Sequence, residues 1–254
     1  MADNKKMDLH HEYHFLLDSD SSLNHHFHVA SRPSIPAPAR KWNEYSDVLS
    51  QSGTMRKAMD AFEEVSFSLS CNFIEDEYTF NDRWRKIRSW LLSDTSERKF
   101  QESYDLQWYR KVSKIEVSEL SRTMYTLGEF TITITVDPYD YAVSGDSWCS
   151  IDDVKLNHYY KSEPLWQITN SGTSPATCTI TVNDKAFEIT DIKAGETKYV
   201  DVERRLTYSI DSQNYYLRAG RYGQEEWLML QNGANSISVT DGFKVLVKPR
   251  WRNV

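Results

Sequence analysis

The chain has 254 residues and a mass of 29.7 kDa, with a formal net charge of -7 and a pI near 5.5. Hydrophobic residues make up 39% of it and charged residues 26%, a balance that excludes an intrinsically disordered chain and a membrane protein. The acidic charge also argues against a surface that binds polyanions over the whole molecule. The length allows one large all-β domain or two smaller domains, and we expect two.

The N-terminal residues MADNKKMDLHHEYHF lack the apolar core of a signal peptide, so we expect a protein that is made and folded in a cytosol. The three cysteines, Cys71, Cys149 and Cys178, are an odd number and form no C-x-x-C pair. They predict neither a disulfide framework nor a zinc site, and we interpret them as free thiols in a reducing compartment.

Three prolines within six residues mark residues 31–42, SRPSIPAPARKW, as an extended arm or edge connection. Proline fixes φ and has no N–H to donate, so this stretch, which includes Pro33 and Pro36, cannot form a helix or a central strand. Two short strand candidates precede it, at residues 13–19 and 25–31.

Two segments alternate apolar and polar side chains, as half-buried strands do. In residues 61–74 the apolar face holds Val65, Phe67, Leu69, Cys71 and Phe73. In residues 128–141, GEFTITITVDPYDY, it holds Phe130, Ile132, Ile134 and Val136. This second segment is the strongest strand prediction in the chain. Between them, residues 104–120 predict a long β-segment with a bulge near residues 111–113.

Residues 82–92 switch to a helical period and predict an α-helix, with Asn81 or Asp82 as its N-cap. The apolar residues at i, i+3 and i+7 are Trp84, Ile87 and Leu91. The helix also carries a basic face that includes Arg85 and Arg88. Most charged helix faces are simply solvated, and the alternative is a helix that lines an aqueous channel or an interface.

The polar stretch VSGDSWCSIDDV, residues 143–154, breaks the pattern and predicts a boundary between domains at 1–143 and 144–254. Short strand candidates follow at 164–172, 176–192, 196–202, 205–211, 226–230, 236–240 and 243–249. The pair Asn183 and Asp184 is a two-residue hairpin connection of the kind that tolerates positive φ. Short strands at this spacing predict a β-sandwich.

The last twelve residues, FKVLVKPRWRNV, place four basic side chains and a tryptophan at the end of an acidic chain. The alternation from Phe243 to Val247 predicts a closing strand, which Pro249 ends because it has no N–H to donate. We interpret Arg250 and Trp251 as a short segment that packs back on the sandwich, with Trp251 as its anchor, and not as a tail that binds nucleic acid.

Patterns of catalysis and metal binding are not indicated. The N-terminal region is rich in histidine, at His10, His11, His14, His25, His26 and His28. We interpret these as exposed or partly packed strand residues, since metal sites need convergent ligands, usually with a Cys, Asp or Glu.

The sequence has no G-x-S-x-G elbow and no phosphate-binding glycine motif. Adjacent acids such as Asp152/Asp153 and Glu225/Glu226 point to opposite faces in a strand and cannot share a substrate. We therefore expect no enzyme and no cofactor.

These pieces, in this order, resemble the distal tail protein (Dit) family of long-tailed, non-contractile bacteriophages, in particular its lactococcal-type short form. The resemblance lies in the arm RPSIPAP, the helix end IRSWLLS, the strand and turn GEFTITITVDPYDY and the terminal KPRW, and it spans residues 28 to 252. The positions that carry it are Pro33, Pro36, Trp90, Leu91, Phe130, Pro138, Tyr139, Pro249, Arg250 and Trp251.

The resemblance implies a mainly β fold with one helix, in which an N-terminal β-sandwich-like domain forms a ring and a C-terminal galectin-like β-sandwich projects from it. It implies a homohexamer in the tail tip of the virion, assembled in the bacterial cytoplasm, which joins the tail tube protein to the tail-associated lysin or tail-tip protein and to a baseplate or receptor-binding protein. DNA would only pass through the channel, and no membrane would be contacted. Sugar-binding galectins use H-x-N-x-R and W-x-x-E patterns, which this sequence lacks, so a scaffold role is favoured.

Two other classes of function are kept as alternatives. A carbohydrate-binding module attached to the host cell wall would be a β-sandwich with exposed aromatics, such as Trp148, Trp166 or Trp227, that stack on sugar. A cell-wall hydrolase would need a paired acid and base, and the sequence indicates no such pair, which ranks it last.

Overall fold

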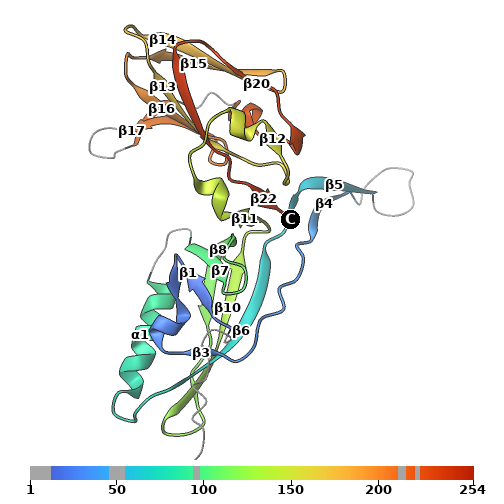
Figure 1. The fold of residues 1–254 in the computed structure, drawn as a ribbon. Coiled ribbons are helices and arrows are strands. Elements are labelled where there is room, and N and C mark those ends of the chain that lie inside the picture. The colour runs from blue at the N-terminus through green and yellow to red at the C-terminus, as the bar shows by residue number, and fades with distance from the viewer. Residues whose placement is uncertain (1–12, 46–54, 94–97, 211–215, 221–223) are drawn as a thin grey trace, which may run out of the picture. The chain divides into compact units, whose positions relative to one another are not determined.

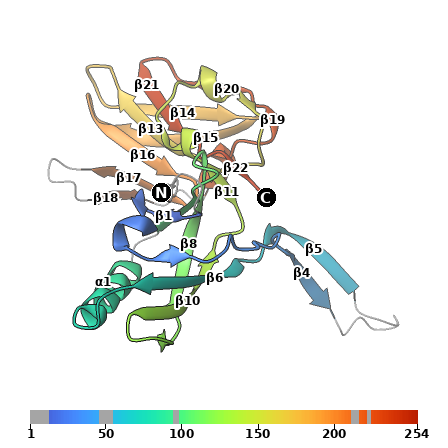
Figure 2. The ribbon, with the colours of Figure 1, turned by 60° about the horizontal axis from the view of Figure 1, so that its bottom comes forward.

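The computed structural model describes residues 13–45, 55–93, 98–210, 216–220 and 224–254. Within these ranges the chain forms two compact units (Figures 1 and 2), an N-terminal unit of residues 1–140 with Val254 and a C-terminal unit of residues 141–253. The described residues form many β-strands and a single α-helix, so the predicted mainly β fold with one helix is confirmed.

The N-terminal unit is a curled antiparallel sheet with a helix packed against it. Its strands are hydrogen-bonded in the order β2-β1-β7-β8-β10-β6-β3, β9 pairs with β10, and β4 and β5 form a separate hairpin. The bounds are β1 (Phe15–Leu17), β2 (Asp20–Ser21), the 3-10 helix η2 (Ser22–His25), β3 (His28–Val29), β4 (Arg40–Tyr45), β5 (Met55–Phe62), β6 (Val65–Ile74), α1 (Phe80–Leu92), β7 (Arg98–Glu102), β8 (Trp108–Val117), β9 (Ser121–Arg122) and β10 (Leu127–Val136).

The two segments with the clearest alternation pair with each other toward the β3 edge of this sheet. β6 and β10 are antiparallel over their full ten residues. Their apolar side chains, such as those of Leu69 and Ile132, are fully buried. Serines and threonines occupy the opposite face, where the hydroxyl oxygens of Ser68 and Thr133 lie 3.0 Å apart. The period-two pattern is confirmed, and it fixes which face of the sheet is buried.

The sheet curls so that strands far apart in its order share one core. The rings of Phe67 on β6 and Phe100 on β7 have centroids 5.2 Å apart, although β8 and β10 separate these strands in the sheet. A single sheet that closes on its own apolar face in this way gives the unit the sandwich-like cross-section that the resemblance implied.

Helix α1 packs on the same core through Phe80, Ile87 and Leu91, which are at most 1% exposed. It begins two residues before the predicted start, and Thr79 stands at its N-cap in place of either predicted polar residue. The ring of Phe80 packs against Phe73, with centroids 4.8 Å apart. Because the Phe80 ring is buried in the core, the first turn of helix α1 begins before Asn81 and Asp82, the two residues predicted as its N-cap.

Strand β8 contains the predicted bulge. Lys114 pairs with Thr135 and Val112 pairs with Val136, so Ser113 is the extra residue. Strand β7 is not indicated by the sequence, because its five residues, RKFQE, include only one apolar side chain, Phe100. Backbone pairing with β1 on one side and β8 on the other holds β7 in the sheet.

The proline-rich arm has no regular secondary structure over residues 32–39, as predicted. Pro33 is half-buried and Pro36 is exposed, while Ile35 between them packs on the core. The arm leads into the β4–β5 hairpin, which pairs with no other strand among the described residues. The sequence does not indicate this hairpin, because its strands lack the apolar face on which alternation depends.

The C-terminal unit consists mainly of two sheets, one in the order β18-β17-β16-β13-β21 and one in the order β15-β14-β20. Two short pairs, β12 with β19 and β11 with β22, accompany them. The bounds are β11 (Asp140–Ala142), η3 (Val143–Asp146), η4 (Asp152–Val154), β12 (Leu156–Asn157), β13 (Leu165–Asn170), β14 (Ala176–Val182), β15 (Lys185–Ile192), β16 (Thr197–Asp201), β17 (Leu206–Ile210), β18 (Tyr216–Gly220), η5 (Glu225–Leu228), β19 (Gly233–Ala234), β20 (Ile237–Val239), β21 (Phe243–Lys248) and β22 (Arg252–Asn253).

The two larger sheets enclose a second hydrophobic core. Trp166, Val200 and Val247 enter it from the five-stranded sheet, and Ile180 and Phe187 enter it from the three-stranded sheet, all at most 1% exposed. Facing sheets that share one core form a β-sandwich, as the short strands predict.

The hairpin between β14 and β15 has the predicted two-residue connection. Asn183 has a φ of 49° and Asp184 a φ of 68°, both in the left-handed region, while Val182 pairs with Lys185. Asn and Asp tolerate this region better than most residues, which is why the pair forms a tight turn here.

Residues 226–230 do not form the predicted strand. They begin within the 3-10 helix η5, where the N–H of Trp227 donates to the carbonyl of Gln224 at 2.9 Å. Leu228 and Leu230 are both buried, and this two-residue spacing imitates a strand. The adjacent acids Glu225/Glu226 and Asp152/Asp153 lie in 3-10 helices too, so the argument that a strand separates them is wrong.

Candidate functional site

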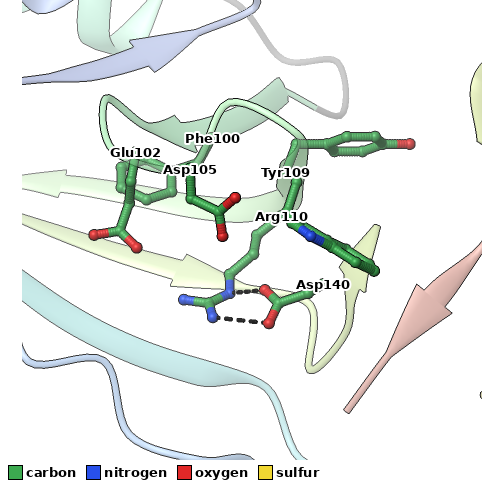
Figure 3. Close-up of a pocket in the computed structure, with 7 residues that line it drawn as sticks. Phe100, Glu102, Asp105, Tyr109, Arg110 and Asp140 are labelled. Carbon is green, nitrogen blue, oxygen red and sulfur yellow. Dashed lines mark hydrogen bonds and ion pairs between the residues drawn. The ribbon is translucent and has the colours of Figure 1, made fainter. Parts of the chain in front are cut away.

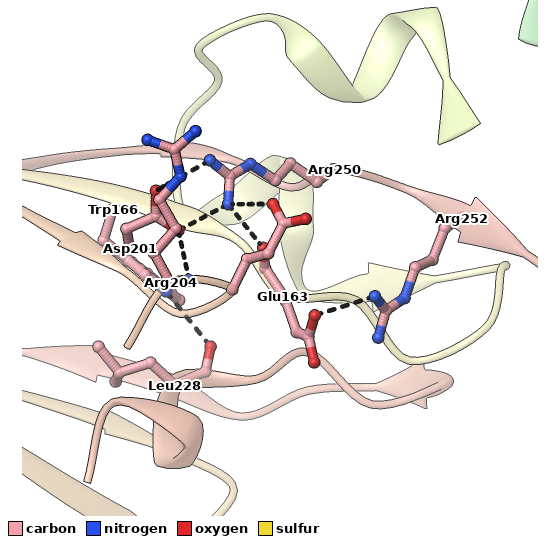
Figure 4. Close-up of polar contacts among 8 residues, drawn as sticks. Glu163, Trp166, Asp201, Arg204, Leu228, Arg250 and Arg252 are labelled. Carbon is pink, nitrogen blue, oxygen red and sulfur yellow. Dashed lines mark hydrogen bonds and ion pairs between the residues drawn. The ribbon is translucent and has the colours of Figure 1, made fainter. Parts of the chain in front are cut away.

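Buried ion pairs fasten the C-terminal tail to the sandwich (Figure 4). Arg250 donates to both carboxylate oxygens of Asp201, at 2.8 and 3.2 Å. Arg252, which is 4% exposed, donates to the carbonyl of Lys161 at 2.8 Å and to the carboxylate of Glu163 at 3.0 Å. Because these guanidinium groups are engaged inside the unit, the tail has the character of a closing segment and not of a basic arm.

Trp251 lies between these two arginines and packs against the second core. Its carbonyl accepts the N–H of Ala142 at 2.8 Å, and its ring centroid lies 5.9 Å from that of Tyr159. The chain at Gly145 approaches so closely that a Cβ there would collide with the backbone nitrogen of Trp251. The glycine is therefore required for the tail to dock.

The Asp201 carboxyl is the buried centre of this network. Its residue is 2% exposed, and burial alone would raise its pKa. Hydrogen bonds and charge from Arg250, assisted by Arg204, outweigh the burial and hold the pKa of Asp201 below its usual value. The carboxylate is consequently ionised at neutral pH and stabilises the docked tail.

This depressed pKa predicts an acid-sensitive C-terminal unit. A carboxyl whose folded pKa lies below its unfolded value stabilises the fold above the unfolded pKa of about 3.9, and that stabilisation is lost as the pH falls through the folded pKa. We expect the free energy of unfolding to decrease below about pH 4, and to decrease less steeply in Asp201→Asn. Urea titrations at a series of pH values measure this, and equal slopes for the two proteins would contradict it.

The end of helix α1 is held by Arg98, a residue that the sequence does not single out. Its Nη1 donates to the carbonyls of Trp90 and Leu91, at 2.8 and 3.2 Å, and its Nε lies 2.8 Å from Asp18. A cation at the C-terminal end of a helix pairs with the otherwise unsatisfied carbonyls there. The ring of Trp90 also stacks on His25, with centroids 4.1 Å apart. The carbonyls of Trp90 and Leu91, the stacked Trp90 ring and the buried Leu91 side chain thus hold the end of helix α1 on the sheet.

Arg85 and Arg88 are both exposed on helix α1. Arg85 forms an ion pair with Asp82 at 2.5 Å, and the Arg88 guanidinium carbon lies 5.5 Å from the ring centroid of Trp84. These contacts partly offset the basic face that the sequence predicts. Exposed pairs of this kind contribute little to stability.

The remaining positions of the resemblance serve packing. Phe130 is 4% exposed, and its ring centroid lies 5.0 Å from that of Trp84. Tyr139 meets Phe62 edge to face, with centroids 6.1 Å apart, and Pro138 before it is half-buried. Pro138 and Tyr139 fix the turn after β10, whereas Phe130 lies within β10 and lines a hollow of about 310 Å³ beside that strand.

A small cleft in the N-terminal unit contains the ion pair between Arg110 and Asp140 (Figure 3), with N···O distances of 2.5 and 3.1 Å. Glu102 and Asp105 also line it. Its volume of about 40 Å³ is far below the roughly 300 Å³ at which ligand pockets begin. The Arg110–Asp140 ion pair occupies the cleft, and the volume of the cleft suits ordered water.

The three tryptophans considered for sugar binding differ sharply in exposure. Trp166 is fully buried and donates its indole N–H to the carbonyl of Leu228 at 3.3 Å, so it cannot stack on a ligand. Trp227 is half-buried. Trp148 is 37% exposed, and Lys248 Nζ lies 5.0 Å from its ring centroid. The sandwich therefore offers one partly covered tryptophan of the three.

Groups for catalysis or metal binding do not converge in the part of the chain that the structure describes. No cluster of three His, Cys, Asp or Glu residues there could hold a metal ion. All three cysteines are free thiols, and burial raises the pKa of Cys71 to about 12 and that of Cys178 to about 11, so neither is a thiolate nucleophile at neutral pH. His10 and His11 lie outside the described residues. None of the helices in the described ranges is long and apolar enough to cross a membrane.

Solved structures resemble the chain over nearly its whole length. The SPP1 Dit protein, described as a paradigm of the hub adsorption apparatus in phages that infect Gram-positive bacteria, matches with a TM-score of 0.64 and 11% sequence identity. The match covers 95% of this chain and 98% of that protein. The chain has a Dit-like fold.

Chains from two structures of the phage P2 baseplate in its activated conformation, with Ca and with Sr, also match this chain, at a TM-score of 0.50 each. Their identities are 11% and 10%, and the matches cover 95% and 92% of this chain and 98% and 97% of theirs. No protein-family model matches the sequence, and no curated protein matches it significantly. The resemblance stated from short motifs is thus confirmed at the level of the fold.

Proposed function

We propose that this protein is a structural hub of a siphophage tail tip, without enzymatic activity. The observation that carries the proposal is the match to the SPP1 Dit hub protein over 95% of this chain and 98% of that one, a coverage that spans both units of this chain. The two baseplate structures add support for a place in the virion tail among other baseplate proteins. One fold can host several functions, so the role is proposed by analogy with the full-length match at 11% identity.

In this proposal the N-terminal domain, residues 1–143, forms a homohexameric ring, and the galectin-like sandwich, residues 144–254, projects from it. The ring joins the tail tube protein to the tail-associated lysin or tail-tip protein, and the sandwich carries a baseplate or receptor-binding protein. The channel is left open for DNA, and Arg85 and Arg88 line it or an interface. Assembly takes place in the host cytoplasm.

The β4–β5 hairpin supports self-association. A two-stranded hairpin without a third strand is only marginally stable alone in water. This one exposes Trp42, at 53%, and Met59, at 38%, and pairs with no other described strand. Its exposed apolar side chains and open strand edges are features that a partner subunit would cover.

The mass of the purified full-length chain in solution tests the proposal. Sedimentation velocity with multi-angle light scattering is expected to find a discrete species of six copies of the 29.7-kDa chain, in concentration-dependent equilibrium with smaller forms. A chain that is strictly monomeric at every concentration would contradict a self-assembling hub.

Carbohydrate binding is the less favoured function. It would require exposed aromatic side chains on the sandwich, and Trp166 is buried while Trp148 is partly covered by Lys248. Calorimetry against host cell-wall polysaccharide distinguishes the two proposals, because micromolar binding that Trp148→Ala abolishes would favour the module over the hub.

A further inference from the structure

One end of the N-terminal unit carries an exposed apolar patch that the proposed function leaves unused. We call it the apolar tip. It consists of four large side chains from the end of β6 and the two loops beside it, and their exposed fractions are 74% for Ile74, 95% for Tyr78, 64% for Met124 and 76% for Tyr125. Side chains this large are seldom left so exposed together, and such groups mark interaction sites.

Backbone bonds hold the two loops of the apolar tip together. Ile74 pairs with Leu127 at the end of the β6–β10 ladder, and the N–H of Glu75 donates to the carbonyl of Thr126 at 3.0 Å. Arg122 donates to the carbonyl of Tyr125 within the second loop. The four side chains are therefore presented from one joined platform.

The rim of the apolar tip is acidic. Asp76 and Glu77 are exposed beside Tyr78, and Glu119 and Glu129 line an adjacent hollow of about 310 Å³. The nearby basic groups are engaged within the chain, since Arg83 lies 2.6 Å from Glu75 and Arg122 sits over the ring of Phe80 at 4.3 Å. The apolar tip thus fits a partner that presents basic side chains next to apolar ones.

The β4–β5 hairpin of this same chain has that chemistry. It exposes Arg40, Lys41 and Lys57 next to Trp42 and Met59. Its described side chains also include one exposed acid, Asp60. The guanidinium carbon of Arg40 lies 5.1 Å from the ring centroid of Phe62, so Lys41 and Lys57 carry the outward basic charge of these side chains. The exposed side chains of the apolar tip and its rim are acidic and apolar. The hairpin and the apolar tip therefore carry opposite charges, and both expose large apolar side chains.

Within one copy the two surfaces are separated by a strand. The hairpin ends at Phe62, just before β6 begins at Val65, and the apolar tip starts at the other end of β6, at Ile74. Ten residues of strand extend over roughly 30 Å. Contact between the two surfaces is consequently favoured between copies.

We infer that the apolar tip is the surface on which the β4–β5 hairpin of a second copy of this chain docks. The inference rests on the proposed hub function. A contact between two different surfaces of identical subunits is heterologous, and such contacts close into a ring when the rotation between subunits permits it. Tyr78 and Tyr125 are the anchors, and Asp76 and Glu77 select the lysines of the hairpin.

Charge exchange between the two surfaces tests the inference in the full chain. The first variant reverses the rim with Asp76→Lys and Glu77→Lys, the second reverses the hairpin with Lys41→Glu and Lys57→Glu, and the third combines all four. Sedimentation velocity is expected to find the dissociation constant raised more than about tenfold in each of the first two, and returned to within about threefold of the unmodified value in the third.

Two further variants separate docking from general effects. Tyr78→Ser with Tyr125→Ser is expected to weaken association more than about tenfold, because exposed aromatic anchors dominate interfaces. Glu188→Lys with Leu156→Ser makes comparable changes at exposed positions of the C-terminal unit and is expected to leave association unchanged. Circular dichroism monitors folding, which these exposed substitutions should preserve.

The outcomes distinguish the inference from the hub function on which it rests. Normal assembly of the variants with altered tips would overturn the inference and leave the hub intact. Loss of assembly that the combined reversal does not restore would also overturn it, since the hairpin would then not be the occupant of the tip. A monomeric unmodified chain would contradict the hub function itself.

Discussion

Deletion of residues 249–254 is expected to lower the free energy of unfolding of the C-terminal unit by about 5 kcal/mol or more. The deletion removes Arg250 and Arg252, and it leaves Asp201, 2% exposed, without its bidentate partner. Loss of one member of a buried pair costs about 3–5 kcal/mol, because the other charge stays buried. Most domains have only about 5–15 kcal/mol in total, so the unit should be partly unfolded at 37 °C.

Thermal and urea unfolding followed by tryptophan fluorescence measure this effect. The matched control is a chain that lacks only Val254, which is 47% exposed and takes no part in the ion pairs around Asp201 and Glu163. It should unfold like the full chain. If the six-residue deletion had the same unfolding midpoint as this control, the fastening role of the tail would be wrong.

Trp166→Ala is expected to destabilise the sandwich by about 3–5 kcal/mol. The indole is the largest fully buried side chain, and its removal leaves a cavity between the sheets and an unpaired carbonyl at Leu228. Trp148→Ala serves as the control and should change stability by less than about 1 kcal/mol, because Trp148 is 37% exposed.

Urea unfolding of the two tryptophan variants, combined with calorimetry against cell-wall polysaccharide, distinguishes a role of Trp166 in folding from a role in sugar binding. The hub function predicts that Trp166→Ala acts through folding alone. A Trp166→Ala protein that unfolds like the unmodified chain but has lost sugar binding would instead support a carbohydrate-binding module.

The predictable parts of the fold are those where one face of an element is apolar. The alternation in β6 and β10 identifies the buried face of each strand, and the spacing of Ile87 and Leu91 identifies the helix. Strand β7 and the β4–β5 hairpin have no such face. They exist because neighbouring strands or the partner strand of the hairpin satisfy their backbone groups, which a local pattern does not reveal.

The buried polar contacts are less predictable than the core, because they join residues that are far apart in sequence. The bond between Arg250 and Asp201 joins residues 49 positions apart, and that between Arg98 and Asp18 joins residues 80 apart. The terminal sequence marks Arg250 as unusual for its place, but it does not identify a partner. Only the tertiary fold shows that these charges neutralise one another.

Self-assembly into a closed ring is the central claim, and electron microscopy of the purified full-length chain tests it most directly. Two-dimensional class averages viewed along the axis should show a ring with sixfold symmetry and an open centre. Averages that show single two-lobed particles, or open chains of subunits without closure, at concentrations well above the dissociation constant measured in solution would contradict it.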